Sequence, residues 1–88
     1  MEYQSISQLI FHSTILKEEI VMKFESFGLN VAKERIKKNL SAYELSLRLG
    51  KDASYINKLE NGKINVSLKM ILAICEQLEI NVVDLFKE

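Results

Sequence analysis

The sequence has no proline and no tryptophan, and it holds only three glycines among 88 residues. Proline and glycine are the residues that most often interrupt helices and form tight turns, so their scarcity favours helical segments. Gly28, Gly50 and Gly62 are therefore interpreted as helix junctions. Alternating runs of β-branched residues, the usual signal of strands, are also missing. These absences predict an all-α protein.

Histidine and cysteine are nearly absent, since His12 and Cys75 are single examples. One cysteine excludes an intramolecular disulfide and is typical of the reducing cytoplasm, where we expect the protein. Cys75 lies among apolar residues and is expected in the core. Without a Cys/His cluster, a phosphate-binding glycine loop or a nucleophile elbow, the sequence favours no metal, cofactor, small-molecule substrate or enzyme activity. It also has neither a stretch resembling a membrane span nor a secretory pattern at its N-terminus.

An excess of charge of either sign is missing too, because 12 basic and 12 acidic residues give a net charge of +0. The charge is unevenly distributed, however. Residues 31–62 carry seven basic and four acidic side chains, a net of +3, whereas residues 1–30 and 63–88 are net negative. A basic segment is the usual electrostatic feature of a surface that binds nucleic acid, although the field of this one is modest.

Residues 40–62 have the pattern of two short helices joined by a tight turn. Apolar residues recur at i, i+4 in the first half and at i, i+3 in the second, which predicts one buried face on each helix. These residues are Leu45, Leu49, Ile56 and Leu59. Gly50 lies between the two pairs, where a helix can end in a left-handed conformation. We expect N-caps at Ser41, in a capping box with Glu44, and at Asp52.

The apolar spacing and the cap residues of the whole chain predict six helices. They cover residues 3–25, 29–38, 42–49, 53–60, 67–78 and 81–87. Ser67 and Asn81 are the expected N-caps of the last two.

Residues 27–87 resemble the lambda-repressor-like (Cro/CI-type, XRE) helix-turn-helix family. The resemblance rests on Leu40-Ser41, Glu44-Leu45, Leu49-Gly50, Ser54-Tyr55-Ile56, Leu59-Glu60-Asn61-Gly62-Lys63, Ser67-Leu68, Ile71-Leu72, Ile74-Cys75, Leu78 and Val82-Val83-Asp84-Leu85-Phe86. It implies that residues 28–88 form a DNA-binding domain, a compact bundle of five short helices. An added N-terminal amphipathic helix would occupy residues 1–27.

In this family, the helix that follows Asp52 is the one that enters the major groove of DNA. The resemblance therefore implies base contacts by Ala53, Ser54, Asn57 and Lys58. Lys58 can donate to guanine, Asn57 can pair with adenine, and Ser54 can reach either type of base edge. Ala53 offers only a methyl contact to thymine. For Asn57 and Lys58, an ordinary solvated helix face is the alternative.

The resemblance also implies contacts with the DNA backbone. The residues concerned are Ser41, Ala42, Tyr43, Tyr55, Lys63 and Arg35. Ala42 stands where the family commonly has a phosphate-binding glutamine, so only backbone N–H groups can serve there. Tyr55 could instead pack against the domain with its hydroxyl in water. Arg35 is further implied to form a structural pair with Glu60, and loss of one partner should destabilise the domain.

The N-terminal segment is richer in apolar residues than one small core can cover. Leu9, Leu16, Ile20 and Phe24 recur at helical spacing, and Phe27 ends the same stripe. The first four predict a dimerisation surface, and packing of this helix on its own domain is the alternative. A symmetric homodimer would suit an operator with two half-sites.

Two functions are consistent with these residues. The first is a sequence-specific transcriptional regulator, a small dimeric repressor that occupies an operator on double-stranded DNA and blocks polymerase. The second is a protein-interaction module on the same fold, antirepressor or antitoxin-like, that has lost base reading. Lys58, Lys63 and Arg35 favour the first, whereas Ala42, Ala53 and the neutral net charge favour the second.

Overall fold

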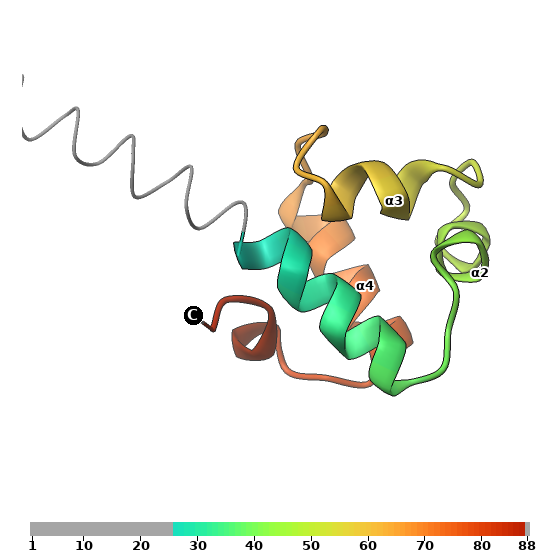
Figure 1. Ribbon diagram of the computed structural model, residues 1–88. Helices are drawn as coiled ribbons and strands as arrows, with labels where there is room; N and C mark the ends of the chain where they lie inside the picture. The colour runs from blue at the N-terminus through green and yellow to red at the C-terminus, as the bar shows by residue number, and fades with distance from the viewer. Residues whose placement is uncertain (1–25, 88) are drawn as a thin grey trace, which may run out of the picture.

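The computed structural model describes residues 26–87, and the regular secondary structure of this part of the chain is helical, with no strand (Figure 1). A helix over residues 26–37 is followed by α2 (Ala42–Arg48), α3 (Tyr55–Glu60), α4 (Leu68–Leu78) and the 3₁₀ helix η1 (Val82–Leu85). The all-α prediction is confirmed for these residues. The expected fifth short helix of the bundle is a single 3₁₀ turn. None of these helices is long and apolar enough to cross a membrane.

The expected N-terminal helix at residues 3–25 lies outside the described residues, as do Leu9, Leu16, Ile20 and Phe24. Phe27 is described, and it is buried in the core, where its ring stacks on Phe86 with centroids 5.3 Å apart. The last residue of the expected N-terminal stripe therefore belongs to the folded domain. It lies in the same helix as residues 28–37.

Local hydrogen bonds account for most of the helix ends. The hydroxyl of Ser41 accepts the N–H of Glu44 at 2.9 Å, and that of Ser67 accepts the N–H of Met70 at 3.1 Å, so both N-caps are confirmed. Gly50, just after α2, has a φ of +72°, a left-handed conformation that costs glycine little.

Two expected caps differ in the structure. The carboxylate of Glu44 accepts from Arg48 Nη2 at 2.9 Å, so it is drawn toward the next turn of α2 and the capping box lacks its second bond. Helix α3 begins at Tyr55 with Ser54 in the N-cap position, about one half-turn later than expected from Asp52. Asp52 instead closes the turn that precedes α3, where its carboxylate accepts the Ser54 N–H at 3.0 Å.

The core is formed where the helix of residues 26–37 and α4 pack with α2, α3 and η1. Six of its apolar side chains have no exposed surface: Val31, Leu45, Ile56, Ile74, Leu78 and Leu85. Leu59 and Cys75 are also buried, as expected. Removing large apolar side chains from water is the main driving force for this arrangement, so the core sets the positions of α2 and α3.

Gly28 does not lie at a helix junction, contrary to expectation, because the helix of residues 26–37 runs through it. A Cβ atom at this position would lie 2.5 Å from the backbone oxygen of Glu60. The missing side chain therefore allows the end of α3 to approach the first described helix. Gly28 has a packing role that its sequence neighbours do not reveal.

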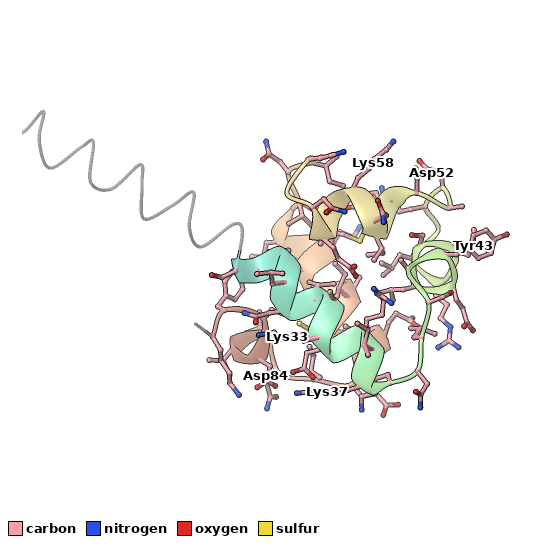
Figure 2. The ribbon with its side chains drawn as sticks, viewed as in Figure 1. Lys33, Lys37, Tyr43, Asp52, Lys58 and Asp84 are labelled. Carbon is pink, nitrogen blue, oxygen red and sulfur yellow. The ribbon has the colours of Figure 1, made fainter. Side chains whose placement is uncertain are left out.

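The C-terminal segment is held against the helix of residues 26–37 by a buried amide. The Nδ2 atom of Asn30 donates to the carbonyl of Leu85 at 3.0 Å and to that of Lys87 at 2.6 Å. Lys33, Lys37 and Asp84 lie on this side of the molecule, away from Lys58 and Tyr43 (Figure 2). The molecule thus has one charged face around η1 and a separate one around α3.

Candidate nucleic-acid interface

Helices α2 and α3 are joined by a buried serine that sequence analysis did not single out. The hydroxyl of Ser46 donates to the carbonyl of Ala42 at 2.7 Å and accepts the N–H of Ile56 at 2.9 Å. Its side chain has no exposed surface. A mid-helix serine often bonds the preceding turn in this way, but only the tertiary structure brings Ile56 to it. The bond fixes the start of α3 against α2.

Arg35 and Glu60, which were expected to pair, form a two-pronged ion pair between the helix of residues 26–37 and the end of α3. Arg35 Nε lies 2.7 Å from Glu60 Oε2, and Arg35 Nη2 lies 3.0 Å from Oε1. Nη1 donates to the carbonyl of Leu40 at 2.9 Å. The hydrogen bond with Glu60 raises the pKa of Arg35, so the guanidinium stays charged.

These bonds define the role of Arg35 in the structure. The side chains of Arg35 and Glu60 are 15% and 11% exposed, so the guanidinium is largely enclosed. Its fork is directed at a carboxylate, the geometry in which arginine binds most strongly. Arg35 therefore positions α3, and a contact with a DNA phosphate stays a prediction.

The four residues expected to contact bases lie on one exposed stretch. Ala53 and Ser54 lie in the turn before α3, whereas Asn57 and Lys58 lie within the helix. All four are exposed, and the side chain of Lys58 points away from the body of the domain (Figure 2). Nothing in the described part of the chain covers this stretch, which is the condition for insertion into a major groove.

Internal hydrogen bonds already engage two of these four residues. The Ser54 hydroxyl donates to Asp52 Oδ1 at 2.7 Å. Asn61 Nδ2 donates to the Asn57 carbonyl at 2.7 Å and approaches Asn57 Oδ1 at 3.4 Å. The sequence pattern indicates Asp52 only as a helix cap, and nothing in it connects Asn61 with Asn57. The side chains on this face are therefore partly oriented before any partner binds.

Asp52 places a negative charge at one end of the exposed stretch. The hydrogen bond from the Ser54 hydroxyl lowers the pKa of Asp52 most, and the bond from the Ser54 N–H has the next largest effect. The positive charges of Lys58 and Lys51 lower this pKa further. Its carboxylate is thus ionised at neutral pH. Figure 2 shows it on the same side of the molecule as Lys58. The interface combines cations with one anion, in keeping with the modest positive charge of residues 31–62.

The residues expected to contact the DNA backbone flank α3 and begin α2. Tyr43 is 60% exposed. Lys63 is exposed in the loop after α3, and its N–H donates to the carbonyl of Lys58 at 2.9 Å. Ser41 is exposed but its hydroxyl caps α2, and Ala42 is half-buried against the core. The start of α2 can therefore offer backbone N–H groups and the Tyr43 hydroxyl.

Tyr55 is half-buried at the start of α3. It packs against the core, and Lys51 Nζ lies 5.4 Å from the centre of its ring. Burial raises the pKa of its hydroxyl, which therefore keeps its proton at neutral pH and can still donate. Both the packing alternative and a phosphate contact are compatible with this position.

The chemistry available on this face is hydrogen bonding and charge. Among residues 26–87, no three His, Cys, Asp or Glu side chains lie close enough together to hold a metal ion. Lysine and asparagine side chains provide donors, and the carboxylate of Asp52 provides acceptors. Such groups bind phosphates and base edges without bond-making chemistry.

Comparison with known families shows that the Helix-turn-helix family model matches residues 31–85. This range includes α2, α3, α4 and η1. No curated protein gives a significant match.

Three solved structures share the fold. The restriction-modification controller protein C.AhdI from Aeromonas hydrophila is 35% identical, with a TM-score of 0.69, and the match covers 75% of this chain and 96% of that one. The clp gene regulator ClgR from Corynebacterium glutamicum is 26% identical, with a TM-score of 0.66, and the match covers 69% of this chain and 65% of that one. A hypothetical transcription factor, NHTF, from Neisseria is 23% identical over 74% of this chain and 75% of its own, with a TM-score of 0.69, and this likeness concerns the fold.

Proposed function

This chain belongs to the lambda-repressor-like helix-turn-helix family of DNA-binding transcriptional regulators, and on that premise we propose that it is a small, sequence-specific repressor. The proposal is carried by the exposed stretch that includes Asn57 and Lys58, which is held rigidly by the Arg35–Glu60 pair and by Ser46. A rigid helix with uncovered polar side chains is what reading of a major groove requires.

In the proposed complex, α3 lies in the major groove. Lys58 and Asn57 contact base edges there, together with Ser54 and the methyl group of Ala53. The start of α2, with Ser41, Ala42 and Tyr43, lies against one phosphate strand, and Lys63 and Tyr55 lie against the backbone on either side of α3. Occupation of an operator in this way blocks polymerase.

We propose that the repressor acts as a homodimer in the cytoplasm. Residues 31–62 have a net charge of only +3, and neutralisation of phosphates supplies most of the non-specific affinity for DNA. A dimer doubles the number of these contacts and reads two half-sites about 34–36 Å apart. The apolar residues Leu9, Leu16, Ile20 and Phe24 are the proposed contact between subunits.

A protein-interaction module is the second candidate, and Asp52 favours it. An ionised carboxylate on the face that would meet phosphates weakens attraction to DNA. Ala42 and Ala53 also provide few polar groups. In this alternative, α3 binds another protein instead of a base edge.

Selection from a pool of random duplex DNA at two salt concentrations tests the proposal. The repressor should enrich a two-fold symmetric site, and its affinity should fall steeply as salt rises. Lys58→Ala should relax base preference at one position of each half-site by about tenfold. Lys63→Ala should weaken binding to all sequences alike and flatten the salt dependence. Absence of any enriched site at low salt would support the protein-interaction module instead.

A further inference from the structure

We propose that Asp52 determines base specificity. Because Asp52 accepts the hydroxyl proton of Ser54, the two side chains together present only hydrogen-bond acceptors, and we call them a paired acceptor. This paired acceptor selects adenine or cytosine over guanine or thymine. The inference rests on the proposed function, since it concerns how the same face reads DNA. Asp52 would be a specificity-determining residue beside α3, in addition to its role in closing the preceding turn.

The direction of the hydrogen bond follows from the chemistry of the two groups. An ionised carboxylate has no proton and can only accept. The 2.7 Å contact between Ser54 Oγ and Asp52 Oδ1 therefore places the single hydroxyl proton of Ser54 on the bond between them. The Ser54 N–H also donates to Oδ1, at 3.0 Å, which holds the carboxylate in place.

The groups that remain available on this pair are all acceptors. Ser54 Oγ retains lone pairs but has no second proton to donate, and Asp52 Oδ2 accepts in the same way. Both residues are exposed, and in Figure 2 Asp52 lies on the side of the molecule from which Lys58 projects. A serine alone can donate or accept and so reads either kind of base edge, but this serine can only accept.

The bases differ in what they offer such an acceptor. In the major groove, adenine N6 and cytosine N4 carry amino protons, whereas guanine O6 and N7 and thymine O4 are acceptors themselves. A paired acceptor therefore binds an amino base and is repelled by a keto base in the same place. Each base pair contains one amino base and one keto base, so the paired acceptor of Asp52 and Ser54 selects which strand carries the amino base.

Hydrogen-bond donors, in place of acceptors, are found one turn further along α3. Asn61 Nδ2 approaches Asn57 Oδ1 at 3.4 Å, so the Asn57 amide is turned with its N–H₂ group free, and Lys58 only donates. Donors there favour guanine or another acceptor edge. The face thus presents an acceptor at the beginning of α3 and donors in its middle, a polarity that an operator half-site would have to match.

Selection from random duplex DNA with wild-type protein and with Asp52→Asn tests the inference. Wild type should prefer adenine or cytosine at one position of each half-site by about tenfold. In Asp52→Asn the amide brings N–H donors to the pair, so guanine or thymine should be tolerated there and the preference should fall to near unity. Asp52 is exposed, and an unchanged circular dichroism melt would show that folding is intact.

Glu44→Gln is the matched control, because it removes one exposed negative charge from α2 without touching Ser54. It should alter overall affinity but leave every base preference unchanged. The inference is overturned if Asp52→Asn retains the amino-base preference, or if Glu44→Gln removes it as well, while both proteins still enrich an operator. Failure of wild type to enrich any site overturns the proposed function together with this inference.

Discussion

Gly28 illustrates how a single residue can have a role opposite to the usual one. Glycine inside a helix normally lowers stability relative to alanine, because its backbone is more flexible when unfolded. In this protein, however, the backbone oxygen of Glu60 occupies the space that a Cβ atom would need. The absence of a side chain is therefore what lets α3 pack against the helix of residues 26–37.

Gly28→Ala should destabilise the domain, although alanine is the better helix former. Relief of the 2.5 Å approach to the Glu60 oxygen requires a shift of backbone, and overpacking of this kind costs about 1–3 kcal/mol. Urea unfolding followed by circular dichroism measures the change. Lys33→Gly, at an exposed position of the same helix, should also lower stability, by about 1 kcal/mol. Stabilisation by Gly28→Ala would contradict the close approach.

At the scale of elements, two polar contacts position α3 relative to its neighbours. Ser46 joins α2 to the start of α3, and Arg35 joins the helix of residues 26–37 to its end. Helix α3 has only six residues and would not be stable alone. Its orientation, and with it the direction of Lys58, therefore depends on groups outside the helix.

Glu60→Ala should lower both stability and DNA affinity. It leaves the Arg35 guanidinium, which is only 15% exposed, without its carboxylate partner, and an uncompensated charge in a part-buried site costs about 2–3 kcal/mol. Thermal melting and a binding titration on one operator measure the two effects.

The double variant Arg35→Met, Glu60→Leu tests whether the loss comes from the orphaned charge. Apolar replacement of both partners of a buried pair is often neutral, so this variant should recover most of the stability lost in Glu60→Ala. An unchanged melting temperature in Glu60→Ala would show that the pair contributes nothing to holding α3.

At the scale of the whole molecule, charge and size limit what one copy can do. The net charge of +0 means that attraction to DNA depends on the local excess around α2 and α3 and not on the molecule as a whole. The charged groups around η1, Glu34 with Lys37 and Asp84 with Lys87, pair with one another at 3.1 and 2.8 Å. Lys37 and Asp84 lie on the other side of the domain from Lys58 (Figure 2), so these two pairs add little to an interface at α3.

We therefore expect a dimer at micromolar concentrations, measured by light scattering or sedimentation. Leu16→Glu with Ile20→Glu should give a monomer that binds a single half-site weakly, because a charge in an apolar contact is costly. Lys17→Glu, a charge reversal in the same segment, should leave the dimer intact. A wild-type mass equal to one chain at high micromolar concentration would exclude the proposed dimer.

Several features of the fold depend only on residues close together in the chain, and the sequence was sufficient to predict them. Ser41 and Ser67 cap helices because a hydroxyl reaches an N–H three residues away, and Gly50 ends α2 because it tolerates a positive φ. The burial of Leu45 and Ile56 follows from helical spacing. The all-α class was predictable for the same reason, whereas the helix-turn-helix family was predicted from the resemblance of residues 27–87 to it.

Other features were decided by the tertiary structure, because they join residues far apart in the chain. The approach of Glu60 to Gly28, the bond between Ser46 and Ile56, and the amide of Asn30 beneath the C-terminal segment exist only after the helices have packed. The Ser54–Asp52 bond spans only two residues, yet its importance depends on the exposed face that this packing creates. Local chemistry determined which helices form, whereas the shared core determined which side chains face outward.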